Sequence, residues 1–431
     1  MALLDYIDII SCKGKRSDIL ESLFYKMIYD NHLKRSMKIL EILHEEKHTI
    51  TIKKLEEHLG VSRKTVFVTL EFVKTLLPEK IYLSISNNEV ELHNAGTETI
   101  EKSLIEVAQK TSSFQILEHA FLNKGLTIHE LSEKLFMSVS ALRARIQHIN
   151  KVLHTFDCSL SLYNLQFIGD EANIRYFGYT YFSEFQELYL FACKEQIPYC
   201  ANVYENIIKR MQEEGSIVIN HSYQQIIRLL LVTRDRVATG KIIKIEDSFI
   251  ERINKRESYQ EFRNIYKTEL SVNLGGIAIP EAEIVWAYVA SFSSIVYLLG
   301  KGKLFYWDTD DIQDYKKNII PFLEEMASKL NIQAGETKEA FIYIHTAYLV
   351  NLILLTEITP VFQIGSYTVK KYVLENLGNL HAIWNKTLSK WASNGLFPLH
   401  NINSVGVQLT MISSLVSLST KGSSHKDIIF F

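Results

Sequence analysis

The 431-residue sequence predicts a mainly α-helical protein of several domains, because a chain of this length exceeds what one core usually organises. Residues 51–77 are echoed by residues 127–153 at a constant offset of 76, and both copies have the apolar spacing of two consecutive amphipathic helices. An alternating segment typical of a β-hairpin follows each copy. Beyond about residue 170, long helical patterns rich in aromatic residues dominate. The expected fold therefore has two related N-terminal domains followed by two helical bundles.

The first copy has the pattern of a short helix, a tight turn and a longer helix, which is the helix-turn-helix arrangement. Leu55 and Leu59 share one face of the short helix, and Gly60 allows the left-handed conformation that commonly ends a helix. Ser62 is expected to cap the longer helix, whose apolar side continues to Leu77. The opposite face begins with residues that could reach DNA base edges and phosphates. These candidates are Ser62, Arg63, Lys64, Thr65 and Phe67.

The second copy keeps the apolar stripe through Leu142, Ile146 and Ile149. Phe136 replaces the turn glycine, so we expect a different backbone solution for this turn. Six residues are candidates for contact with DNA in this copy: Ser138, Ser140, Arg143, Ala144, Arg145 and Gln147.

Each copy is followed by a segment expected to be a wing. Residues 83–92 and 160–169 alternate in polarity and are interrupted by Asn87-Asn88 and by Asn164, as in hairpins with asparagine in the turn. The repeated element is therefore predicted to be a winged helix-turn-helix. A single copy would suit a plain helix bundle equally well, but repetition in register with a wing each time favours nucleic-acid binding.

The charge balance limits how such a protein could bind DNA. The formal net charge is −2, and residues 1–155 contain 21 Lys and Arg against 20 Asp and Glu. Attraction to DNA must therefore be local. The pair Arg63-Lys64, at the start of a predicted recognition helix, is the best placed because phosphates and guanine edges lie within reach there.

Neither a secretory signal nor a membrane span is expected. The first apolar stretch contains Asp5 and Asp8, which does not suit a signal peptide. The uncharged stretches 284–300 and 341–356 approach membrane-span length, but both contain several polar groups and suit buried helices of a bundle. The four cysteines lack CxxC spacing and read as reduced thiols of a cytoplasmic protein.

The second half of the sequence contains no catalytic signature. It has no P-loop, GxSxG or HExxH motif, so we expect no enzyme, no catalytic or metal-binding residues and no cofactor. Two histidines nevertheless lie in helical contexts. His221 is expected at the start of a helix, and His345 lies within one of the most apolar helical patterns. A core histidine explains either position, whereas phosphorylation of the imidazole would add about two negative charges at a packing surface.

The order of these parts resembles the Mga/AtxA family of Gram-positive transcription regulators. Two winged helix-turn-helix domains precede two helical bundles that each offer a histidine, and residues 167–185 (FIGDEANIRYFGYTYFSEF) resemble the family's junction before its first PRD, the phosphotransferase-system regulation domain. The resemblance implies a DNA-binding transcription regulator whose PRDs are phosphorylated at His221 and His345 by the sugar phosphotransferase system, through HPr or EII components. Implied partners are double-stranded promoter DNA and a second copy of the chain.

The expected fold class is mainly α, with two winged helix-turn-helix domains and two all-helical PRD-like bundles. Family members typically continue into an EIIB-like α/β domain, for which the residues after Trp391 are too few, so we expect dimerisation through the helical bundles. The predicted domains are the first winged helix-turn-helix with its helical lead (1–95), the second (96–169), the first bundle (170–274), the second bundle (275–395) and a short remainder (396–431).

Two other functions remain open from the sequence. An RNA-binding antiterminator also carries paired PRDs, but such proteins begin with a small β-rich domain, whereas residues 1–50 are helical in pattern. A protein-interaction module without direct DNA binding would suit the near-neutral charge.

Overall fold

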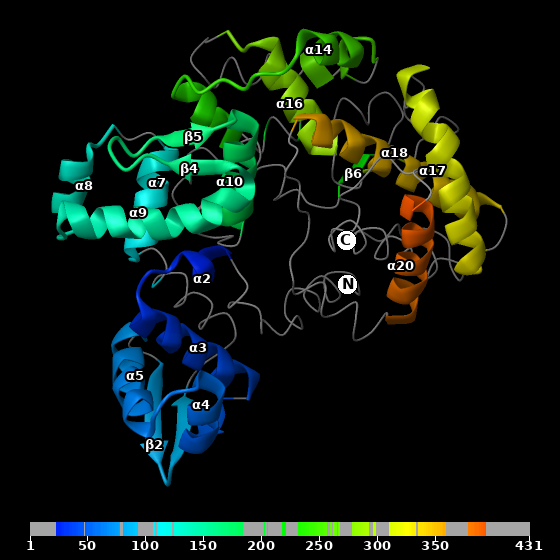
Figure 1. Ribbon diagram of the computed structural model, residues 1–431. Helices are drawn as coiled ribbons and strands as arrows, with labels where there is room; N and C mark the ends of the chain where they lie inside the picture. The colour runs from blue at the N-terminus through cyan, green and yellow to red at the C-terminus, as the bar shows by residue number, and fades with distance from the viewer. Residues whose placement is uncertain are drawn as a thin grey trace. The chain divides into compact units, whose positions relative to one another are not determined.

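The protein forms two compact units that are described separately. The N-terminal unit contains residues 1–169 and 180–191, and the C-terminal unit contains residues 170–179 and 192–431. The computed structural model describes residues 23–46, 48–77, 81–93, 107, 110–122, 125–183, 202, 205, 218–220, 232–256, 259–260, 262–264, 266–267, 278–292, 296–298, 310–332, 335–358 and 378–393. Figure 1 shows these parts as coloured ribbons.

The first winged helix-turn-helix begins with two lead helices, α2 (Leu23–Met27) and α3 (Asn31–Glu45). It continues through β1 (Thr49–Thr51), α4 (Ile52–Leu59), α5 (Arg63–Leu76), β2 (Tyr82–Ser86) and β3 (Glu89–His93). The three strands form an antiparallel sheet with β3 in the centre. The strand β1 was not expected from the sequence, because it is only three residues long and its last residue, Thr51, also caps α4.

The local signals in this repeat act as expected. The Thr51 hydroxyl accepts a hydrogen bond from the Lys54 amide, and the Ser62 hydroxyl accepts one from the Thr65 amide at the start of α5. Gly60 ends α4 with φ of 62°, in the left-handed region. Val66, Leu70 and Val73 of α5 are completely buried, whereas Leu59 is only half-buried. The predicted helix-turn-helix is confirmed in this copy.

The wing of the first repeat is the β2–β3 hairpin. Asn87 and Asn88 form its turn with φ of 49° and 66°. Two successive positive φ values are the requirement of a type I′ turn, which matches the twist of the flanking strands and which asparagine tolerates better than most residues. The predicted hairpin and its Asn-Asn turn are therefore confirmed.

The second winged helix-turn-helix contains α7 (Ser112–Phe121), α8 (Ile128–Lys134), α9 (Val139–Leu153), β4 (Cys158–Leu160) and β5 (Phe167–Gly169). A capping box opens α8, because Thr127 and Glu130 each accept the other's backbone amide hydrogen. Ser138 caps α9 through the Ala141 amide. Leu142, Ile146 and Ile149 are fully buried, as the apolar stripe predicts. Figure 1 shows this repeat in cyan and green, with β4 and β5 antiparallel.

The turn of this second repeat corrects one prediction. Phe136 adopts the same left-handed conformation as Gly60, with φ of 51°. In both turns the next amide donates to the carbonyl five residues earlier: Val61 to Glu56 and Met137 to Ser132. The expectation of a different backbone solution is therefore wrong, because the shared hydrogen bond fixes the turn even though the left-handed region disfavours a Cβ.

The C-terminal unit is mainly helical. Its described helices are α10 (Glu171–Ser183, shared with the N-terminal unit), α14 (Asp247–Asn254), α16 (Glu281–Phe292), α17 (Asp310–Lys329), α18 (Glu336–Ile358) and α20 (Gly378–Ser393). α17 packs against α18 and α20, and α16 packs against α14 and α18. Buried aromatic side chains fill these contacts, for example Phe322 against Trp384 with ring centroids 5.6 Å apart. No helix among the described residues is long and apolar enough to cross a membrane.

The expectation of all-helical bundles requires a correction. The strands β6 (Val218–Asn220) and β7 (Val296–Leu298) pair antiparallel within this unit. The helix predicted over residues 284–300 therefore ends at Phe292 and is followed by a strand. The segment 296–298 is rich in β-branched and aromatic residues, and pairing with β6 overrides the helical spacing. The boundary predicted at residues 274 and 275 stays a prediction.

Candidate nucleic-acid interface

The exposed side of α5 carries a stripe of four residues opposite its buried face. Lys64, Val68, Glu71 and Thr75 are spaced i, i+4, i+7 and i+11, so they share one side of the helix, and all four are exposed. We call these residues the α5 stripe. Because the other side of α5 packs against the core, this stripe is the surface that the helix can present to a DNA groove.

The corresponding α9 stripe lies 76 residues later and contains Ser140, Ala144, Gln147 and Lys151. Ser140, Gln147 and Lys151 are exposed, and Ala144 is half-buried. The two motifs therefore present matched stripes in sequence register. Ser140 and Gln147 were among the candidates from the sequence, whereas Lys151 was missed although the same spacing leads to it.

Arg63 is turned toward the wing and is not part of the α5 stripe. Its Nη2 donates a hydrogen bond of 2.6 Å to Oδ1 of Asn88 at the wing tip. The guanidinium also lies over the ring of Phe67, 5.6 Å from the centroid. The structure thus brings two candidates for DNA contact, Arg63 and Phe67, together with Asn88 of the hairpin turn, where the recognition helix meets the wing.

Arg143 makes the equivalent connection in the second motif. Its Nε donates to the Leu162 carbonyl at 3.4 Å, and its guanidinium lies 5.6 Å from the ring centroid of Tyr163. Tyr163 is 76% exposed at the wing tip. Both motifs therefore use an arginine of the recognition helix to contact the wing. The wing residues Asn88 and Tyr163 were not among the sequence candidates, which came from the helices alone.

Arg145 lies on a different side of α9 from the stripe. Its Nε donates to the Ser112 hydroxyl at 3.0 Å, its Nη1 donates to the Ala141 carbonyl, and its guanidinium lies over the ring of Tyr29 at 5.0 Å. These contacts hold α9 against α7 and the lead helices. A direct DNA contact by Arg145 stays a prediction.

The two cap serines have local partners. The Ser62 hydroxyl lies 3.1 Å from that of Thr65, and the Ser138 hydroxyl lies 2.9 Å from that of Ser140. All these contacts are at the exposed starts of the recognition helices. A helix start is also where unpaired backbone amides favour phosphate oxygens.

The two histidine candidates differ in what the structure describes. His345 lies within α18, is completely buried, and its Nδ1 donates to the Phe341 carbonyl at 2.6 Å. Its ring also packs against Phe341 with centroids 4.2 Å apart. His221 lies outside the described residues, directly after β6. In this conformation His345 is a core histidine, and its phosphorylation stays a prediction.

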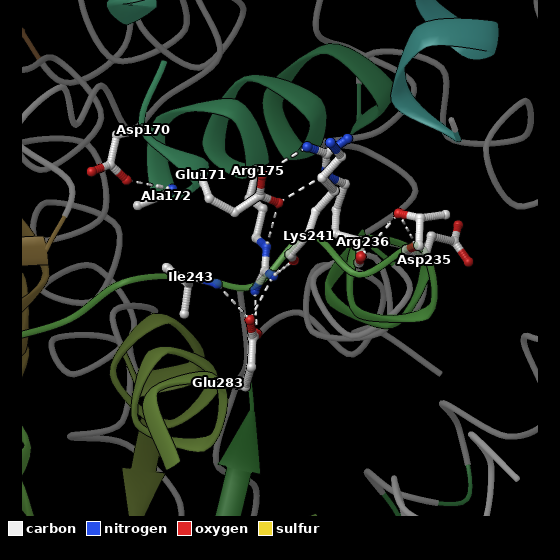
Figure 2. Close-up of polar contacts among 10 residues, drawn as sticks. Asp170, Glu171, Ala172, Arg175, Asp235, Arg236, Lys241, Ile243 and Glu283 are labelled. Atoms are coloured by element: carbon white, nitrogen blue, oxygen red, sulfur yellow. Dashed lines mark hydrogen bonds and ion pairs between the residues drawn. The ribbon is translucent and has the colours of Figure 1, made fainter. Parts of the chain in front are cut away.

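Several buried charges of the C-terminal unit form an ion-pair network, which Figure 2 shows. Arg175 of α10 is fully buried and donates to both carboxylate oxygens of Glu283, at 2.5 and 2.8 Å, and to Glu171 at 3.1 Å. Burial alone would lower the pKa of Arg175, but hydrogen bonds and charge from Glu283 and Glu171 raise it above its usual value. Arg236 completes the network with two bonds of 2.7 Å to Glu171.

This network is a structural feature and not a candidate binding site. Glu283 also accepts from the Ile243 amide at 2.7 Å, and Arg175 donates to the Lys241 carbonyl at 2.9 Å. The charged groups are therefore paired and bonded to the backbone, which is what allows them to be buried. Among the described residues, no cluster of His, Cys, Asp and Glu has an arrangement that could hold a metal ion.

Comparison with known proteins supports this assignment of the N-terminal unit. A family model described as the M protein trans-acting positive regulator (MGA) HTH domain matches residues 32–89, and one described as the Mga helix-turn-helix domain matches residues 94–182. The first range contains α5 and the strand β2 and ends at the first residue of β3, and the second range contains α9 with both strands of its wing.

Similar full-length proteins come from two Gram-positive species. A trans-acting regulator of Streptococcus pneumoniae is 25% identical over 348 residues, which are 78% of this chain and 68% of that protein. The capsule synthesis positive regulator AcpA of Bacillus anthracis is 21% identical over 84% of this chain and 75% of its own length. The anthrax toxin expression trans-acting positive regulator of the same species is 24% identical over 68% of this chain and 59% of its own length. The chain therefore carries the Mga helix-turn-helix domains and is a distant homologue of the Mga-like and AtxA-like trans-acting regulators of Gram-positive bacteria, which are transcription regulators and not enzymes.

Proposed function

We propose that this protein activates transcription by binding double-stranded promoter DNA through α5 and α9, with the two wings beside the phosphate backbone. The observation that carries the proposal is the pair of matched stripes, each on the exposed side of a helix that follows a helix-turn-helix turn. Activation, rather than repression, is supported by the names of relatives that are positive regulators. A cytoplasmic location follows from the proposed role.

The α5 and α9 stripes predict how binding should respond to mutation. Lys64 is exposed at the start of the α5 stripe, and Lys151 is exposed at the end of the α9 stripe. A lysine that neutralises a phosphate releases a counterion when the protein binds DNA. Replacing that lysine therefore makes the plot of log K against log salt less steep, by about one unit of slope. Arg63 and Arg143 are each held at the helix–wing edge, where a guanidinium can reach a phosphate or a guanine.

The test is fluorescence anisotropy with a promoter fragment at several salt concentrations. Lys64→Ala should weaken binding and lower the salt slope by about one, and Arg63→Ala or Arg143→Ala should weaken binding while the fold survives. Lys244→Ala, which changes an exposed lysine of the C-terminal unit, is the matched control and should leave both quantities unchanged. Full affinity in both arginine variants would contradict docking of these helices on DNA.

The same measurement separates the alternative functions. A PRD-containing antiterminator should prefer hairpin RNA over duplex DNA. A pure protein-interaction module should show no strongly salt-dependent binding to either nucleic acid. Duplex binding that weakens strongly with salt therefore supports the proposal against both.

The proposal extends to control of activity by phosphorylation. Residues 170–274 and 275–395 are the proposed PRDs, His221 and His345 are the proposed acceptors, and HPr or an EII component is the proposed donor. Because His345 is completely buried and bonded to the Phe341 carbonyl, phosphorylation there requires α18 to become accessible first. We therefore expect His345 to be modified more slowly than an accessible histidine.

The phosphorylation test uses the full chain with enzyme I, HPr and phosphoenolpyruvate. Acid-labile phosphate should form and should decrease in His221→Ala and His345→Ala. Absence of acid-labile phosphate on the wild-type chain would count against the regulatory proposal and leave DNA binding untouched. Sedimentation of phosphorylated and unmodified protein tests the proposed homodimer, for which the helices of residues 275–395 are the proposed interface.

A further inference from the structure

Val68 is an apolar side chain at the centre of the α5 stripe. It is 53% exposed and lies one turn after Lys64 and one turn before Glu71. The residues on either side of it along the stripe are polar or charged. The position 76 residues later in the α9 stripe is Ala144, which is also apolar. Both recognition helices therefore have an apolar group at the same place, with polar groups before and after it.

The fold does not account for a valine at this position. The buried face of α5 is formed by Val66, Leu70 and Val73, which are fully buried and lie on the other side of the helix. A β-branched residue is also slightly unfavourable in a helix because its χ1 rotamers are restricted. Single exposed apolar residues are common on protein surfaces, so exposure alone would mean little. The apolar residue at the matching position of the second motif, Ala144, indicates that Val68 has a role in binding.

The neighbours of Val68 leave it accessible. On the wing side of α5, the guanidinium of Arg63 lies over the ring of Phe67 and donates a hydrogen bond to Asn88. Glu71 on the stripe is paired with Lys74 at 2.7 Å, which compensates a carboxylate that would otherwise repel phosphates. The centre of the stripe is thus an apolar residue between the exposed Lys64 and Glu71, whose charge is offset by Lys74.

The DNA major groove offers a valine one matching group. Base edges there present hydrogen-bond donors and acceptors, and the C5-methyl of thymine is the apolar exception. We infer that Val68 contacts a thymine methyl group in the major groove and so helps to select the sequence that α5 binds. This inference rests on the proposed function, because it requires α5 to enter the groove, and it adds a specificity-determining residue and the chemical group that it recognises.

The experiment removes the methyl group from the DNA and the valine from the protein, separately and together. Full-length protein first selects duplexes from a random pool, and each thymine of the selected site is then replaced singly by deoxyuracil, which lacks only the methyl group. At one thymine, deoxyuracil should weaken wild-type binding about fourfold, which is the change in affinity expected for the loss of one buried methyl group. Val68→Ala should bind the thymine duplex about fourfold more weakly and should be indifferent to deoxyuracil at that position.

Thr75→Ala is the matched control, because it changes another exposed residue of the same stripe. It should keep the full sensitivity to deoxyuracil. If deoxyuracil weakens the binding of wild type and of Val68→Ala equally at every thymine, the inference is overturned while DNA binding stands. The same holds if deoxyuracil does not weaken wild-type binding at any position. Failure to select any duplex would overturn the proposed function itself. Because Val68 is half exposed and alanine is the better helix former, Val68→Ala should unfold at the wild-type temperature or slightly above it, which a thermal melt verifies.

Discussion

Arg63 and Asn88 are joined by a 2.6 Å hydrogen bond from the guanidinium Nη2 to the amide Oδ1, which connects the first turn of the recognition helix α5 to the tip of its wing. The two residues are 25 positions apart in the chain. Arg143 contacts the second wing through the Leu162 carbonyl. The same relationship in both motifs indicates that the recognition helix and the wing are oriented together before any DNA is bound, which lowers the entropic cost of binding.

Asn88→Gly tests this orientation without harming the hairpin. Asn-Gly is the favoured sequence of a type I′ turn, so the variant keeps the backbone of the wing and removes only the acceptor of the Arg63 bond. We expect the melting temperature to stay the same or rise, and DNA affinity to fall about fivefold, equivalent to about 1 kcal/mol for one hydrogen bond. Asn87→Gly, at the other turn position, should leave affinity unchanged. Equal loss in both variants would assign the effect to the turn and not to Arg63.

Phe136 is expected to destabilise the second turn relative to glycine. Its φ is 51°, and its side chain is 96% exposed, so it gains no packing in this chain for adopting the left-handed conformation. Phe136→Gly should therefore increase the free energy of unfolding by about 1 kcal/mol. The reverse change in the first motif, Gly60→Ala, should decrease it by about 1 kcal/mol, since Gly60 has φ of 62°. Urea unfolding of both variants verifies the opposite signs, and a decrease for Phe136→Gly would show that the phenyl ring has a stabilising contact.

Gly169 at the end of β5 is predicted to be intolerant of any side chain. Its φ is +138°, and a Cβ there would lie 2.9 Å from the Asp157 carbonyl oxygen and 3.0 Å from the Cys158 Cβ. Gly169→Ala should therefore reduce the free energy of unfolding by about 1–3 kcal/mol, since the β4–β5 wing has to move apart. Gly125→Ala is a suitable comparison, because Gly125 also has positive φ but no atom of the described residues lies within 4 Å of the added Cβ. A similar loss in both variants would mean that strain, and not the close approach, limits position 169.

The Arg175–Glu283 pair should be far more sensitive than an exposed pair of the same unit. Glu283→Gln removes the carboxylate from a guanidinium that is completely buried, and breaking such a pair costs about 3–5 kcal/mol. Arg252 and Glu357 form an ion pair in which both side chains are about one third exposed, so Glu357→Gln should cost less than about 1 kcal/mol. Chemical unfolding monitored by tryptophan fluorescence distinguishes them. Equal costs would show that water reaches Arg175.

The sequence was a reliable guide to the N-terminal unit because its signals are local. Ser62 and Ser138 cap their helices through the amides of residues three positions later, and Asn87 and Asn88 bend the wing through their own positive φ values. The apolar stripes of α5 and α9 are buried as their spacing predicts. A repeat in register made these signals stronger, since two copies rarely agree by chance.

The candidate interface was predicted only in part. Helix spacing alone leads to Lys64, Ser140 and Gln147, whose exposure the structure bears out, and the same spacing reaches Val68, which is not among the sequence candidates. The sequence places Arg63, Arg143 and Arg145 at or near a recognition-helix start but does not indicate what each one contacts. Their partners, Asn88, the Leu162 carbonyl and Ser112, come from other elements, and no pattern along the helix contains them.

The sequence by itself determined the two winged helix-turn-helix motifs, the places where their helices begin and end, and the mainly helical character of the rest, because each depends on contacts within a few residues. Only the tertiary structure decided that Phe136 takes the left-handed turn, that residues 296–298 leave a helical pattern to pair with β6, and that Arg175 is buried beside Glu283. For residues 296–298 and for Arg175 the deciding partner, β6 or Glu283, is distant in the chain. For Phe136 the hydrogen bond from the Met137 amide to the Ser132 carbonyl outweighs the preference of the residue itself.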